Sequence, residues 1–252
     1  MVTKLFFHAA AYSGGGTVPI NQTGGAAPAL QGGLSLQTYG QPGADATSVS
    51  RSMNKTIGTN WTNFAITTIA NTATHSYYIT KFISDPLTAQ TINANTWTFM
   101  TGIAETSFNV NLIGYVPVML YVWRPSTGVL VGQLANNPTI TGYAEPDEQG
   151  PANINKITFP QASNLAVQQG DVLILEIWNR FTQSSATAYQ IGFYYDGPTD
   201  LSTSSTNDDA TNIASFIETP QDLTFTTDPG GSPIDMDVTD TIVLVNKFIT
   251  KV

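Results

Sequence analysis

The stretch DVLILEIWNRF at residues 171–181 decides the fold class, because its side chains alternate with a period of two. An aliphatic face consists of Leu173, Leu175 and Ile177. The opposite face holds charged and aromatic side chains, namely Glu176, Trp178 and Arg180. Residues 167–170 (VQQG) precede the stretch and predict a turn in which Gly170 supplies a positive φ and Asp171 bonds backbone amides. A long β-strand is therefore expected here.

Similar short apolar segments recur along the chain, separated by Gly, Pro, Asn and Asp. They are expected as strands at 76–84, 96–103, 115–123, 129–134, 154–159, 189–195 and, as an edge strand, 219–225. The sequence RPSTG at 124–128 predicts a hairpin turn. Residues 57–74 fit either a strand or a short helix. This spacing predicts an all-β protein with an antiparallel β-sandwich or jelly-roll-like domain.

Composition agrees with this fold and excludes several functions. The 252 residues include 36 threonines and 18 asparagines, whereas only 11% are charged, against about 25% in an ordinary soluble domain. The net charge of −9 argues against nucleic-acid binding, since phosphate contacts need clustered Lys and Arg. No cysteine is present to form disulfides or thiolate metal sites, and no apolar run reaches the ~20 residues of a membrane span. A surface so poor in charge fits either a β-rich protein of the extracellular type or a subunit of a permanent assembly.

Three regions differ in composition. Residues 1–56 are rich in Gly, Ala and Thr and are predicted to form an extended N-terminal arm, followed by the sandwich at 57–227. Residues 228–252 are predicted to be a linker and an apolar strand, TIVLVNKFIT. Residues 1–84 contain one acidic and four basic side chains, so the acidic charge lies almost wholly in the rest. Different surroundings are expected for the two parts.

Aromatic side chains on the strands at 115–123 and 171–181 point away from the most aliphatic faces. The candidate site residues are Met119, Tyr121, Trp123, Trp178 and Arg180. Three explanations stay open: a second small core covered by another part of the chain, a subunit interface, or a platform for sugar rings.

The sequence offers little indication of catalysis or metal binding. No nucleophile elbow, phosphate-binding loop, dinucleotide fingerprint or zinc-protease motif occurs, and the spacing of the carboxylates selects no pair for glycoside hydrolysis. We therefore predict no catalytic residues, no cofactor and no enzymatic activity. A structural calcium ion is the one metal considered, at the acidic clusters of residues 235–240 and 207–209.

The stretches TKLFFHAA at 3–10 and SRSMNKTIG at 50–58, with Gly- and Pro-rich sequence between them, resemble the start of small structural proteins of tailed bacteriophages. The segment 171–197 is similar to β-sandwich virion proteins of the same kind. The resemblance implies a location in the virion, as a head decoration (cement) protein or a neck or tail subunit. It also implies a homo-oligomer bound to other virion proteins, chiefly the major capsid protein, with no membrane or nucleic-acid partner. The alternative function is a carbohydrate-binding or host-adhesion module.

Overall fold

The described part of the computed structural model is built from β-strands alone. It comprises residues 2–14, 50–67, 74–105, 118–136, 153–182, 190–200 and 212–226. The strands are β1 (Thr3–Ala11), β2 (Ser50–Asn54), β3 (Thr62–Thr67), β4 (Thr74–Ser84), β5 (Gln90–Ile92), β6 (Thr96–Glu105), β7 (Val118–Arg124), β8 (Val129–Asn136), β9 (Asn153–Pro160), β10 (Leu165–Val167), β11 (Val172–Thr182), β12 (Gln190–Tyr195) and β13 (Phe216–Thr219). The all-β fold class is thus confirmed. No helix among these residues is long and apolar enough to span a membrane.

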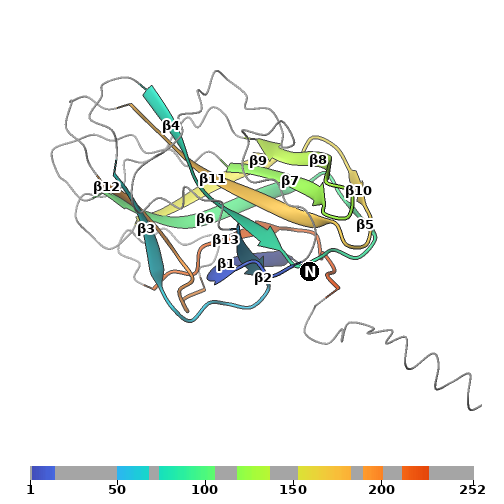
Figure 1. Cartoon of the computed structure of the whole chain (residues 1–252), viewed down its shortest axis with the longest axis horizontal. Coiled ribbons are helices and arrows are strands. Elements are labelled where there is room, and N and C mark those ends of the chain that lie inside the picture. The colour runs from blue at the N-terminus through green and yellow to red at the C-terminus, as the bar shows by residue number, and fades with distance from the viewer. Residues whose placement is uncertain are drawn as a thin grey trace, which may run out of the picture.

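Eleven strands form one mixed sheet, in which ten follow the order β3-β12-β6-β13-β1-β2-β4-β11-β7-β8 (Figure 1). β9 pairs with β6 along residues 96–103, so β13 and β12 must share the opposite edge of β6. β2 and β4 pair in parallel, whereas the other strand pairs of this sheet are antiparallel. β5 and β10 form a separate two-stranded sheet.

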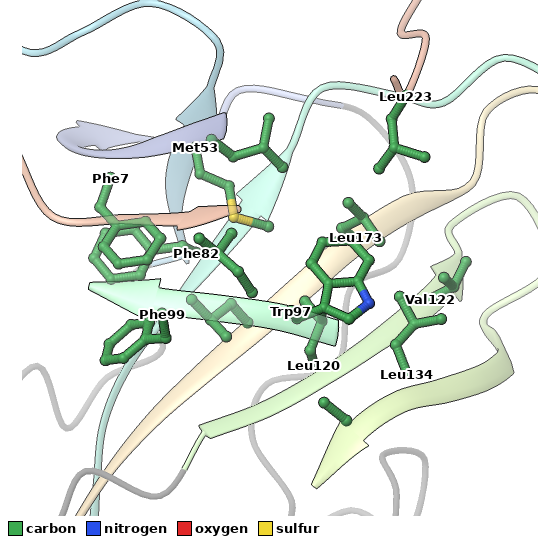
Figure 2. Packing of buried hydrophobic residues seen from close by; sticks show 14 of the residues in the cluster. Phe7, Met53, Phe82, Trp97, Phe99, Leu120, Val122, Leu134, Leu173 and Leu223 are labelled. Atoms are coloured by element: carbon green, nitrogen blue, oxygen red, sulfur yellow. The ribbon is translucent and has the colours of Figure 1, made fainter. Parts of the chain in front are cut away.

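The sheet folds back on itself around one large apolar core. Trp97 and Phe99 of β6 belong to the same buried cluster as Leu120 of β7 and Leu173 of β11. In the strand order β6 and β11 lie far apart, so a shared core requires them to face each other as layers of a sandwich. Figure 2 shows the Trp97 indole beside Leu120 and Leu173. Its Nε1 donates to Gln161 Oε1 at 2.9 Å, which satisfies the buried polar atom.

Two strands lie inside the segment 1–56 that was predicted to be an arm. β1 pairs with β13 on one edge and with β2 on the other, so it is an internal strand. Its consecutive apolar residues at 5–7 are all buried, as expected for a strand covered on both faces. The arm prediction therefore does not hold for β1 and β2, because local sequence does not show which distant strands pair with them. Residues 15–49 and the predicted C-terminal strand within 228–252 lie outside the described residues.

Both predicted turns are present at one end of β11. Gly128 has φ +66° and closes the β7–β8 hairpin, where its N–H donates to the Arg124 carbonyl at 2.9 Å. Gly170 has φ +89°, and the following Asp171 Oδ2 accepts the Gln168 N–H at 2.8 Å. The two turns are joined, because Arg124 donates from Nε to Asp171 Oδ1 at 2.7 Å and from Nη2 to Oδ2 at 2.9 Å.

Candidate functional site

The predicted aromatic face of β7 exists, but it is covered. Met119, Tyr121 and Trp123 point away from the main core, as the alternation required, and each is at most 2% exposed. Tyr121 and Trp123 pack in a second cluster with Ile83, Val172 and Ile174, and Tyr12 packs against it. This arrangement matches the small second core among the three explanations. An interface or glycan role for these residues stays a prediction.

Charged groups lie in the same covered face. Lys81 of β4 stands opposite Glu176 of β11, and both are buried. Tyr121 Oη donates to Glu176 Oε1 at 2.8 Å. Burial lowers the pKa of Lys81 to about 8, and the nearby Glu176 carboxylate opposes this effect. Lys81, Glu176 and Tyr121 thus form a cross-strand polar contact within the covered face. This contact favours one register of the paired strands.

For the remaining candidate residues the structure gives less than the side-chain contacts. Trp178 and Arg180 belong to β11 and are paired in register with Tyr78 and Ser76 of β4, and their side chains lie outside the described set. The acidic clusters considered for calcium, 207–209 and 235–240, also lie outside it. Within the described ranges no group of three or more His, Cys, Asp or Glu side chains could hold a metal ion.

The ends of the Gly-rich segment meet at the sheet. Ala11 of β1 is in register with Arg51 of β2, and the Tyr12 N–H donates to the Ser50 carbonyl at 2.8 Å. The chain thus leaves β1 after Ala11 and enters the neighbouring strand β2 at Ser50. Residues 15–49 therefore connect two paired strands as an insertion, whereas the sequence predicted part of an extended N-terminal arm.

Some of the unevenly distributed charges pair with each other within the chain. Lys4 Nζ lies 2.7 Å from Asp200 Oδ1 and 3.9 Å from Glu218 Oε2, and also 4.3 Å from the centre of the Phe216 ring. Because β1 lies beside β13, the basic N-terminal strand contacts acidic C-terminal residues directly. Charge pairing inside one subunit accounts for part of a pattern that the sequence alone assigned to different surroundings.

A half-buried aromatic pair lies where the chain enters β3. The Trp61 and Tyr194 rings stack with their centroids 4.9 Å apart and their planes at 21°. Tyr194 also packs against a third apolar cluster that contains Phe6 and Phe216. In contrast to Trp123, both rings of the pair retain some exposed surface. The sequence analysis missed this pair because its members come from strands whose pairing was unknown.

Comparisons with known proteins give only distant likenesses. No protein-family model matches the chain, and no curated protein matches it. A CocE/NonD family hydrolase from Staphylococcus aureus aligns at 8% identity and TM-score 0.39, over 67% of this chain and 34% of the hydrolase. The structure of infectious bursal disease virus, Gx strain, aligns at 11% identity and TM-score 0.26, over 77% of this chain and 50% of the viral chain. The chain thus spans half or less of the length of these two proteins.

These matches correct the prediction about enzymatic activity and do not refine the prediction of a virion protein. The hydrolase match contradicts the prediction that the protein has no enzymatic activity, and that prediction is not retained. The viral match is a weak likeness to a viral β fold and fixes no bacteriophage family. Neither match assigns an activity or a partner to this chain, since both have identities near 10% and TM-scores below 0.5.

Proposed function

We propose that the protein is a structural subunit of a virion, in which the sandwich anchors residues 15–49 for contact with other virion proteins. In its finer form, the proposal is a capsid decoration or cement protein that forms a homo-oligomer on the major capsid protein. A neck or tail subunit is the variant of this proposal. The observation that carries it is the attachment of the insertion to adjacent positions of β1 and β2.

The attachment of residues 15–49 to β1 and β2 suits a contact that must resist mechanical force. Force applied to the insertion would be shared by the hydrogen-bonded ladders that hold β1 and β2, which are internal strands of the sheet. The insertion is rich in Gly, Ala, Gln and Pro and contains a single charged residue, Asp45. A segment with so little charge can enter an interface without leaving unpaired ions buried there.

The experiment replaces residues 15–49 by an Asn-Gly turn, which can join the two antiparallel strands. We expect the variant to keep the thermal unfolding profile of the wild-type protein, because the strand pairs stay intact. We also expect it to be lost from purified virions, as measured by quantitative mass spectrometry. A matched control carries the same 35 residues in scrambled order.

Three outcomes are informative. Absence of the wild-type protein from purified virions would refute the virion role. Wild-type incorporation of the turn variant would refute the role of the insertion and leave the sandwich faces as the contact. Incorporation of the scrambled control would show that length and composition are sufficient and that no specific sequence is recognised.

Glycan binding is a second candidate because one observation favours it. The stacked, half-buried pair Trp61 and Tyr194 presents aromatic surface of the kind that packs on sugar rings. If this function is correct, Trp61→Ala removes retention on a glycan array without unfolding the protein. The matched control is Trp123→Phe at the buried position, which should leave glycan retention unchanged. Absence of any retention by the wild-type protein eliminates this candidate.

A further inference from the structure

Three strands of the large sheet have a hydrogen-bonded neighbour on one side only, within the part of the chain that the structure describes. They are β3 and β8, at the two ends of the strand order, and β9, which pairs with β6 alone (Figure 1). An edge strand offers every second N–H and C=O of its backbone to another strand, so natural proteins block most such edges. A comparison of the three edges therefore shows where a further strand could add.

Two of the three edges carry features that oppose pairing with another strand. β9 contains Lys156, which is charged and exposed, and it ends at Pro160, which has no N–H to donate. The pairing of β8 with β7 is irregular at two places, and Leu165 of β10 lies so close to Gly132 that a Cβ there would overlap its side chain. Charge, proline and irregular pairing are the features with which proteins protect a sheet edge.

β3 differs from β8 and β9 in all of these respects. Its sequence TNFAIT contains no charged residue and no proline, and Thr, Phe and Ile favour extended backbone. It pairs with β12 in one regular register, from Thr62 opposite Tyr195 to Thr67 opposite Gln190. The outer edge of β3 is therefore regular and neutral, and its sequence does not oppose the addition of a strand.

Aromatic surface lies beside this edge. Trp61 directly precedes β3, and its ring stacks on Tyr194 of β12 with the centroids 4.9 Å apart. Both residues are only half-buried. Trp and Tyr are enriched in protein interfaces, where their rings become covered. The edge thus combines backbone positions suited to a further strand with aromatic surface that a protein partner would bury.

The chemistry of the edge favours a second copy of this chain as that partner. An antiparallel edge is complementary to itself, because a two-fold axis perpendicular to the sheet places the donors of each copy opposite the acceptors of the other. With the axis through Phe64 or Ala65, no like charges oppose each other along the paired strands. Each copy carries a net charge of −9, so two copies repel each other in general and approach at lowest cost along a neutral strand.

We propose that the protein forms a two-fold symmetric dimer in which the β3 strands of two copies pair antiparallel and join the two sheets. The inference rests on the homo-oligomer that is part of the proposed function, and it names the contact that forms it. Purified protein tests the dimer, whereas incorporation into virions tests the virion role. Either can therefore fail without the other.

The test is sedimentation velocity of the full chain over a range of concentrations up to about 100 μM. We expect a dimer that dissociates on dilution. Ala65→Lys should weaken this dimer about tenfold or more, because it brings two like charges close together across the two-fold axis. Ala65 is paired with Gly192, so the new side chain has no side chain directly opposite on β12. The matched control is Thr158→Lys at an exposed position of β9, which should leave the dimer unchanged.

Three results would overturn the proposal. The first is a wild-type protein that stays monomeric over the whole range, and the second is a dimer that Ala65→Lys leaves unchanged. The third is a dimer that Thr158→Lys weakens as much as Ala65→Lys does, since the effect would then come from added charge in general. None of these results bears on whether the protein is present in purified virions.

Hydrogen exchange on the wild-type protein keeps the proposal testable if Ala65→Lys fails to fold. Every second amide of β3 points away from β12 and should gain protection only in the dimer. Dilution below the dissociation constant should therefore lower the protection of these amides by about tenfold or more, whereas the amides of β9 should keep theirs. Equal behaviour of the two strands on dilution would contradict pairing through β3.

Discussion

Two junctions in this molecule use an aspartate carboxylate as the acceptor for different donors. In the Asp171 junction, the carboxylate accepts the Gln168 N–H and a two-bond contact from Arg124. In the Asp196 junction, it accepts the Ala9 N–H and a ring nitrogen of His8. The bond to Asp171 raises the pKa of Arg124 still further above its ordinary value, so this guanidinium stays charged at any working pH. The Asp171 junction thus depends on a permanent cation, whereas the Asp196 junction depends on a backbone N–H and an imidazole ring.

The largest expected effect comes from removing each carboxylate. Asp171 is fully buried and serves three donors, so Asp171→Ala should lower the free energy of unfolding by about 3 kcal/mol. Asp196→Ala should cost less, about 1–2 kcal/mol, because that side chain is partly exposed. Urea denaturation at pH 7 measures both. Equal losses would remove the distinction between the junctions.

Substitution of the glycine beside each aspartate should give a smaller difference in stability. A Cβ at Gly197 would overlap the backbone carbonyls of Asn212 and Ile213, so Gly197→Ala should destabilise the protein by about 2–3 kcal/mol. Gly170 has open space around its Cβ position, and only its positive φ opposes a side chain. Gly170→Ala should therefore cost about 1 kcal/mol. Thermal unfolding of the two variants tests this order, and a reversal would contradict the close backbone contact at Gly197.

Lys81 is a buried cation whose effect on stability depends on pH and should be the smallest. Its pKa is lowered to about 8, so between pH 8 and 10.5 the unfolded chain holds this proton and the folded chain does not. Stability should consequently rise as pH increases through this window. In Lys81→Met the rise should be absent in Tm measurements from pH 7.5 to 10.5. A rise that persists unchanged in the variant would assign it to other groups.

The sequence predicted the strands of the sandwich where alternation was regular. β11 and the β7–β8 hairpin were found with both of their turns, because side-chain periodicity and the Gly170–Asp171 and Arg124–Gly128 signals are local. β1 was missed as a sheet strand although its buried run at residues 5–7 is typical of an internal strand. The glycine-rich sequence after it outweighed that signal.

The candidate site was harder to predict. Alternation correctly placed Tyr121 and Trp123 opposite the main core, but exposure depends on which distant segments cover a face. The contacts of His8 with Asp196 and Asn54 combine residues from three separate parts of the chain, and no spacing in the sequence relates His8 to Asp196. A bulge adds the further difficulty that it shifts the register by an amount that only the paired strands reveal.

The position of β1 also has a consequence for synthesis. Thr3 Oγ1 accepts the N–H of Leu223, 220 positions further along the chain, and β13 is the partner that completes one edge of β1. The ribosome therefore synthesises β1 long before it synthesises β13. Contacts of such long sequence separation slow folding, and the waiting strand is exposed to wrong partners. The pairing of β1 with β13 is accordingly a late step in the folding of this sheet.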